Sequence, residues 1–119
     1  MIKLIASDLD GTIIDSHHHI SQDNLVAMEA LENSDTNFVI CTGKTYALSK
    51  HFCHDFHANF GIFGNGSQII NLKTGEEISK KLLSFSEIMT CLSIAKEHQL
   101  HVHAYTDDCI LTEKLLYMD

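Results

Sequence analysis

Two aspartates, Asp8 and Asp10, follow a short apolar run at residues 2–7 and lie two positions apart. In an extended chain such residues point to the same side, so one site can use both carboxylates. An ionised Asp8 can attack phosphorus as a carboxylate nucleophile. Asp10 can protonate the leaving oxygen and later activate water. The pair therefore favours phosphoryl transfer.

Two further apolar runs also end in polar residues. Thr42 follows the run at 38–41, and Asn65 follows the run at 61–64. Ligands of open α/β sheets collect at the carboxyl ends of strands, so Asp8, Thr42 and Asn65 are expected around one crevice. The Thr42 hydroxyl can hold a phosphoryl oxygen, or it can cap a helix, and the two roles are compatible. Asn65 and the glycine after it are also an ordinary turn signal.

The turn after the first run has its own uses. Gly11 would let the backbone approach a phosphate closely, and Thr12 can hydrogen-bond within the turn. A Mg²⁺ ion held partly by Asp8 would neutralise the approaching anions. The first segment alone thus offers acids, a glycine and a hydroxyl to one substrate.

Strands and helices alternate in the part of the chain that must position these residues. The apolar runs predict buried strands, and helix-start signals at Ser21 to Asn24 predict a helix of about ten residues. In order, the prediction is a strand at 2–7, that helix, a strand at 38–41, a helix at 45–56 and a strand at 61–64. This order indicates an α/β fold, a Rossmann-like open parallel sheet with right-handed crossovers.

The pattern changes after Ser67. Residues 67–79 predict a hairpin around a glycine turn, and residues 86–98 predict a helix. Residues 101–105 and 109–112 predict a pair of strands. We therefore expect a core domain at 1–82 and part of a second, α/β domain at 83–119.

Composition excludes several classes of protein. The 119 residues are 45% hydrophobic and 20% charged, as in globular proteins. A formal net charge of -8 repels nucleic acid and anionic membrane surfaces. The N-terminus does not resemble a signal peptide, and no apolar stretch is long enough to span a membrane. Four widely spaced cysteines favour reduced thiols and a cytoplasmic protein.

Asp8-Leu9-Asp10-Gly11-Thr12 after an apolar strand resembles the first motif of the haloacid dehalogenase (HAD) superfamily, and Thr42-Gly43 resembles its second. The segment from Asn65 onward resembles the Cof-type branch (subfamily IIB), in which an α/β cap follows the second motif. The resemblance implies a Mg²⁺-dependent phosphatase that hydrolyses a small phosphorylated metabolite through an aspartyl-phosphate. It implies that Asp8 and Asp10 are catalytic and bind the metal. The candidate phosphate- and substrate-binding residues are Leu9, Gly11, Thr12, Thr42, Gly43, Lys44 and Asn65.

The chain departs from this family pattern in two ways. Lys44 stands where Cof-like members usually have arginine. Lysine has the same charge but lacks the planar guanidinium group, which can bind phosphate through two hydrogen bonds at once. The family's later lysine and acidic metal-binding motif, encoded after the cap, are not found among these 119 residues. We therefore expect an N-terminal portion that is weakly active or inactive alone. An incomplete sheet would also favour a homodimer.

Other interpretations remain open at this point. A non-catalytic phosphate-binding or assembly module would keep the same crevice, and a receiver-like phospho-acceptor domain also clusters acids at strand ends. His51, His54 and His57 share a spacing of three that allows a transition-metal site, although surface histidines are common. The histidines at 17–19 are expected in a solvated loop, and those at 98, 101 and 103 on the cap surface. Cys41 is expected to pack in a strand.

Overall fold

The computed structural model describes residues 1–53 and 55–112, and of residue 52 it describes the backbone alone. The chain forms two compact units, Met1–Lys80 and Lys81 onward. The change of unit thus falls two residues before the division expected at residue 82.

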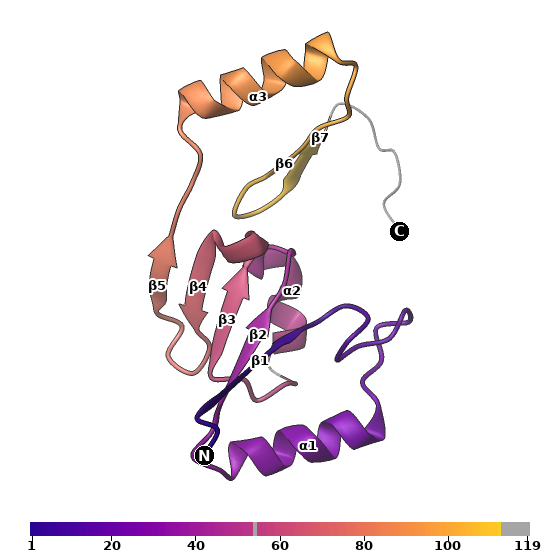
Figure 1. Ribbon diagram of the computed structural model, residues 1–119, viewed down its shortest axis with the longest axis vertical. Helices are drawn as coiled ribbons and strands as arrows, with labels where there is room; N and C mark the ends of the chain where they lie inside the picture. The colour runs from indigo at the N-terminus through magenta and orange to yellow at the C-terminus, as the bar shows by residue number, and fades with distance from the viewer. Residues whose placement is uncertain (54, 113–119) are drawn as a thin grey trace. The chain divides into compact units, whose positions relative to one another are not determined.

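The first unit is built on one mixed sheet of five strands (Figure 1). Its order is β1 (Leu4–Asp8), β2 (Asn37–Cys41), β3 (Phe60–Phe63), β4 (Gln68–Asn71) and β5 (Glu77–Lys80). The first three strands are parallel, and β4 and β5 continue the sheet as an antiparallel hairpin. The predicted α/β class is confirmed. Only the first three strands of the sheet are parallel, and these are the strands that lead to the candidate site residues.

The register of the parallel strands aligns their carboxyl ends. Asp8 is paired with Cys41, and Cys41 is paired with Ile62. The residues that follow these positions therefore leave the sheet at the same end of the strands. The three loops that follow β1, β2 and β3 thus begin next to one another.

Helix α1 (Gln22–Glu32) follows β1 after a loop and begins as its sequence predicts. The Ser21 side chain accepts a hydrogen bond from the Asn24 amide at 3.2 Å, which satisfies one of the unpaired donors of the first turn. Helix α2 (Tyr46–Cys53) is shorter than the predicted helix at 45–56. The chain turns after it, and His57 has a φ of 49°, which is incompatible with a continuing right-handed helix.

A single apolar cluster holds the first unit together. The side chains at its centre are almost fully buried: Leu9, Ile14, Ile40, Phe56 and Phe63. Met28 of α1 and Ile70 of β4 join the same cluster, so the helices and strands share one core. β1 is an edge strand of the sheet, and Leu4 on it is 54% exposed. The homodimer expected from an incomplete sheet stays a prediction.

The second unit contains α3 (Phe85–Glu97) and a hairpin of β6 (His103–Tyr105) and β7 (Ile110–Thr112). A reciprocal capping box starts the helix, because Ser84 accepts from the Glu87 amide and the Glu87 carboxylate accepts from the Ser84 amide. Among the described residues of this unit only Ala95 is buried. The unit is thus ordered by local hydrogen bonds much more than by a core.

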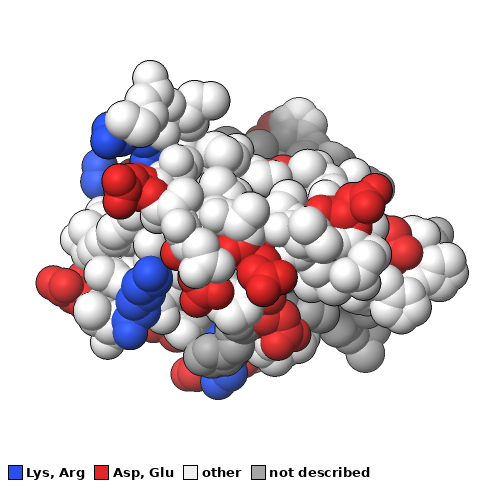
Figure 2. All heavy atoms as spheres, turned by 90° about the horizontal axis from the view of Figure 1, so that it is seen from below, with Lys and Arg blue, Asp and Glu red and all other residues white. Residues whose placement is uncertain are grey.

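The surface and the thiols agree with the composition. Acidic side chains predominate over basic ones on the face shown in Figure 2, which agrees with the net charge of -8. All four cysteines are free, as expected. In the described part of the chain no helix has the length and apolar character needed to cross a membrane.

Candidate active site

A hollow opens at the carboxyl ends of β1, β2 and β3. It has a volume of about 350 Å³ and is lined by Asp8, Cys41, Thr42, Gly43, Ile62, Asn65 and Gly66. Four residues chosen from the sequence therefore meet in one hollow, namely Asp8, Thr42, Gly43 and Asn65. The expectation that three strand ends converge on one crevice agrees with this geometry.

Thr42 is held from both sides in the loop after β2. Its amide donates to the Ile62 carbonyl at 2.9 Å, and its own carbonyl accepts from the Asn65 amide at 3.3 Å. Its hydroxyl oxygen accepts from the Lys44 amide at 3.2 Å, which closes a local turn. Helix α2 begins only at Tyr46, so Thr42 stabilises the turn before that helix rather than capping it.

The loop after β3 is left-handed over three successive residues. Gly64, Asn65 and Gly66 have φ values of 55°, 54° and 97°. Glycine adopts this region without strain, and asparagine tolerates it better than most residues. A Cβ atom added to Gly43 would lie 3.0 Å from the Asn65 Oδ1 atom. Glycine at position 43 therefore makes room for the Asn65 side chain in the hollow.

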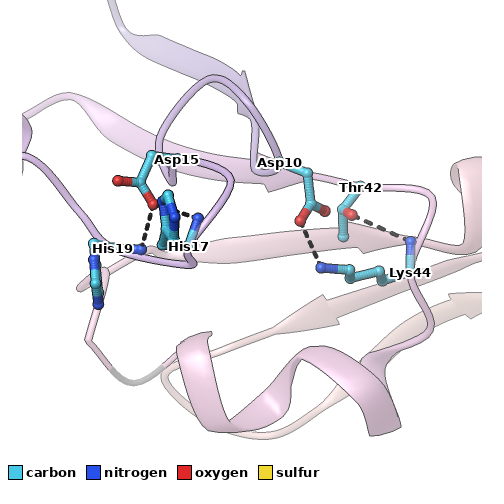
Figure 3. A network of polar contacts seen from close by, with 6 residues as sticks. All are labelled: Asp10, Asp15, His17, His19, Thr42 and Lys44. Atoms are coloured by element: carbon cyan, nitrogen blue, oxygen red, sulfur yellow. Dashed lines mark hydrogen bonds and ion pairs between the residues drawn. The ribbon is translucent and has the colours of Figure 1, made fainter. Parts of the chain in front are cut away.

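Asp10 and Lys44 form an ion pair beside the hollow (Figure 3). The Lys44 Nζ atom lies 2.5 Å from the Asp10 Oδ1 atom, and both side chains are partly exposed. The Lys44 backbone is fixed at both ends, because its amide donates to Thr42 and its carbonyl accepts from the Gly64 amide at 2.9 Å. The ammonium thus sits on an anchored residue, within reach of the second catalytic candidate.

Gly11 and Thr12 line a different hollow from Asp8 and Thr42. Gly11 has a φ of 74°, and its amide donates to the Ile14 carbonyl at 2.8 Å. That bond turns the chain back on itself directly after Asp10. The Gly11 amide is therefore already hydrogen-bonded within the turn, and glycine suits this position because it adopts a left-handed backbone conformation without strain.

Leu9 lies between Asp8 and Asp10 in the sequence, and its side chain points into the core. Its side chain has no exposed area and belongs to the core. Its carbonyl accepts from the amides of Ile13 and Ile14, both at 3.0 Å. Leu9 thus anchors the acidic loop to the core, and its side chain does not line either hollow.

Asp15 is a residue of this region that the sequence did not single out. Its Oδ1 atom accepts from the amides of His19 at 2.9 Å and His17 at 2.8 Å, as Figure 3 shows. These two hydrogen bonds lower the pKa of the Asp15 carboxyl. The exposed loop at 17–19 is thereby held by a carboxylate rather than by packing. An aspartate just before a polar run is the signal that would have found this turn.

The donors in the first hollow suit a hard cation. Burial, and then the charge of Asp8, raises the pKa of the Cys41 thiol, which keeps that thiol protonated at neutral pH. The other acidic side chain in the lining is Asp8, and its carboxylate oxygens are ligands that Mg²⁺ prefers. The described residues contain no group of three or more histidines, cysteines or acids placed to hold a metal. Asp8 and Asp10 would therefore supply only part of a coordination shell.

The transition-metal site that the spacing of His51, His54 and His57 allows stays untested. His54 lies outside the described residues. The His57 Nδ1 atom lies 3.1 Å from the Glu32 Oε1 atom, so this ring contacts an acid at the end of α1. Cys41 is half-buried in its strand, as expected for a packing residue.

Comparison with known proteins places the chain in a family. A model of haloacid dehalogenase-like hydrolases matches residues 5–116, which is nearly the whole chain. The chain belongs to this family.

The relatives of the chain are named as phosphatases. A Streptococcus pyogenes (serotype M6) protein with the provisional name of a phosphatase is 30% identical over 93% of this chain and 43% of its own length. A Bacillus subtilis 5-amino-6-(5-phospho-D-ribitylamino)uracil phosphatase is 30% identical over 88% of this chain and 42% of its own length. A Klebsiella pneumoniae HMP-PP phosphatase is 29% identical over 90% of this chain and 39% of its own length. The chain thus spans less than half the length of these relatives.

Solved structures share the fold. The HAD-superfamily phosphatase BT1666 of Bacteroides thetaiotaomicron has a TM-score of 0.86 at 23% identity, over 98% of this chain and 43% of that one. The HAD subclass IIB sugar phosphatase BT4131 has a TM-score of 0.76 at 20% identity, over 91% of this chain and 42% of that one. The chain therefore has the fold of the corresponding part of these two phosphatases.

Proposed function

We propose that this chain carries the nucleophile and the phosphate-binding loops of a Mg²⁺-dependent phosphatase that hydrolyses a small phosphorylated metabolite. The observation that supports this most is the single hollow lined by Asp8, Thr42 and Asn65. Phosphatase names among the relatives support the reaction class, and their phosphorylated small-molecule substrates support the substrate class. The four free thiols fit a reducing, cytoplasmic setting.

The first step would form an aspartyl-phosphate. The Asp8 carboxylate attacks phosphorus, the bond to the leaving oxygen breaks, and its electron pair stays on that oxygen, which takes a proton from Asp10. The Thr42 hydroxyl oxygen already accepts from the Lys44 amide, so its hydrogen can be donated to a phosphoryl oxygen. Mg²⁺, when bound through oxygens of Asp8 and Asp10, would neutralise phosphate charge.

The second step would return the enzyme to its starting state. Asp10 takes a proton from water, the water oxygen attacks phosphorus, and the bond to Asp8 breaks to release inorganic phosphate and the free carboxylate. Asp10 must leave its ion pair with Lys44 to exchange protons in this way. The Lys44 ammonium would then turn to the phosphoryl oxygens, and the Lys44 backbone would keep its place in the loop after Thr42, because both its amide and its carbonyl are hydrogen-bonded.

A second candidate function is a non-catalytic module that binds phosphate and metal. The Asp10–Lys44 ion pair favours it, because the pair ties up the group that would have to move protons. Such a module would still bind inorganic phosphate in the hollow at the strand ends. It would release no product.

Kinetics with an aryl phosphate and Mg²⁺ separate the two candidates. The wild-type chain is expected to release the aryl alcohol slowly, and Asp8→Asn to abolish that release. Asp35→Asn, an exposed acid that lines neither hollow, is the matched control and should leave the rate unchanged. Release that survives Asp8→Asn contradicts the proposal. Phosphate binding seen by NMR without any release supports the non-catalytic module instead.

A further inference from the structure

Two histidines face each other on the hairpin of the second unit. The Nε2 atoms of His101 and His103 lie 2.9 Å apart and form a hydrogen bond whose donor depends on which ring carries the proton, and the rings meet edge to face with their centroids 4.7 Å apart. Both side chains are exposed. Each ring therefore turns one nitrogen toward the same point at the protein surface.

Both strands of the hairpin contribute to the place where these nitrogens meet. His103 is the first residue of β6, and His101 lies two residues before it, in the segment that leads into the strand. Thr112 is the register partner of His103 on β7, and its Oγ1 atom lies 3.0 Å from the His101 Nε2 atom. The His101 Nε2 atom thus contacts one side chain from each strand, His103 of β6 and Thr112 of β7.

The distance between the nitrogens suits two ligands of one metal ion. Imidazole nitrogens bind first-row metals at about 2.0–2.1 Å, which puts two of them about 2.9 Å apart at a right angle and about 3.3 Å apart at a tetrahedral angle. The observed 2.9 Å fits the right angle. Square-planar and octahedral geometries have such angles and are typical of Cu²⁺ and Ni²⁺.

We propose that His101 and His103 form a binding site for a late first-row divalent metal, with Cu²⁺ or Ni²⁺ preferred over Zn²⁺. This site is separate in its residues and chemistry from the oxygen-lined hollow of Asp8 and Thr42. The described residues place no third histidine, cysteine or acid with the pair, so water completes the coordination shell. The net charge of -8 attracts the cation.

The Thr112 hydroxyl contacts one histidine of the pair. It contacts the same His101 nitrogen that faces His103, so it competes with the metal for that lone pair when it donates a hydrogen bond. Thr112→Val keeps the β-branched shape and removes the hydroxyl. This variant is expected to bind the metal as tightly as the wild type or more tightly.

Titration of the purified chain with Cu²⁺ alone, followed by calorimetry, tests the site. One binding step is expected to be weakened on the order of tenfold or more in both His101→Ala and His103→Ala. His98→Ala is the matched control, because His98 is an exposed histidine of the same unit at the end of α3, and it should leave that step unchanged. Zn²⁺ is expected to bind more weakly than Cu²⁺.

Other histidines of the chain make a second measurement necessary. Paramagnetic broadening by Cu²⁺ in NMR spectra should reach residues around His101 and His103 first, and His103→Gln should remove that early broadening without disturbing the fold. Early broadening centred on residues 17–19, or a tight step that survives both alanine variants, overturns the proposal. Neither outcome bears on the phosphatase proposal, which concerns other residues and is read out by aryl phosphate hydrolysis.

Discussion

The two units are stabilised in different ways. In the first, Ile40, Phe56 and Phe63 are almost fully buried, and the acidic loop is tied to this core through Leu9. In the second, only Ala95 is buried among the described residues, while Phe85 and Leu83 are more than 60% exposed. A preorganised acid site needs a rigid support, and only the first unit supplies one from its own residues. Each unit also offers a different cation chemistry, oxygen in the first and imidazole in the second.

The largest expected effect concerns a matched pair of isoleucines. Ile40→Ala in β2 should lower the free energy of unfolding by about 2–5 kcal/mol, because the side chain is fully buried. Ile88→Ala in α3 should change it by less than about 1 kcal/mol, because that side chain is 38% exposed and alanine favours a helix. Urea unfolding followed by circular dichroism measures both. Equal costs would remove the distinction between the units.

The second largest expected difference between the two units is in the reactivity of their cysteine thiols. Burial raises the pKa of the Cys53 thiol to about 11 from an ordinary value of 9.0, which leaves about 100-fold less reactive thiolate at neutral pH. Cys91 and Cys109 of the second unit are exposed. Iodoacetamide labelling followed by peptide mass spectrometry should modify these two first and Cys53 last. Rapid labelling of Cys53 would mean that the core of the first unit opens readily.

A smaller effect is expected at the start of α1. Ser21→Ala removes the oxygen that accepts from the Asn24 amide and should cost about 1 kcal/mol of stability. Ser21→Gly is the control, and its cost should be only a few tenths of a kcal/mol, on the order usual for glycine at this position. Thermal unfolding of the two variants gives the comparison. A Ser21→Ala variant as stable as the wild type would show that the hydrogen bond does not stabilise the helix.

The helix of the second unit should respond to acid. Hydrogen bonds from the Ser84 amide and then from its hydroxyl lower the pKa of Glu87 below its ordinary value of 4.5. A lowered pKa means that the carboxylate stabilises the helix start fully above that ordinary value and ceases to do so as the pH falls through the lowered pKa. Helix content of α3, followed by NMR, should therefore fall in this acidic range. Glu87→Gln should remove that dependence, and an unchanged profile would contradict the capping box.

The smallest expected effect is a gain. Ser49 of α2 has no exposed area, and its Oγ atom has no hydrogen-bond partner among the described residues. Ser49→Ala removes this unpaired group and improves helix propensity, so stability should rise by up to about 1 kcal/mol. Ser67→Ala, at a partly exposed position outside the helix, offers a serine control without this gain. A loss of stability in Ser49→Ala would mean that the hydroxyl has a partner after all.

Much of the fold was predictable because the apolar runs and caps are local signals. The strands before Thr42 and Asn65 and the Ser21 start of α1 were all evident in the sequence. The end of α2 was not, because the turn depends on the positive φ of His57, and histidine is not a usual signal for it.

The site was predictable in part. Strand ends brought Asp8, Thr42 and Asn65 together as expected. The Asp10–Lys44 ion pair joins residues 34 positions apart, so only the fold could reveal it. The hydrogen bond from the Gly11 amide to the Ile14 carbonyl could not be predicted, because the residue types do not decide the path of this loop. The approach of the Gly11 backbone to a phosphate stays a prediction.

The central claim is that Asp8 is the group that takes up phosphorus. Intact-mass measurement after incubation with an aryl phosphate and Mg²⁺, followed by peptide mapping, tests it directly. The account predicts the gain of one phosphoryl group on Asp8, labile to hydroxylamine as an acyl phosphate is, and its loss in Asp8→Asn but not in Asp35→Asn. A phosphoryl group found on any other residue, or gained equally by Asp8→Asn, would contradict it.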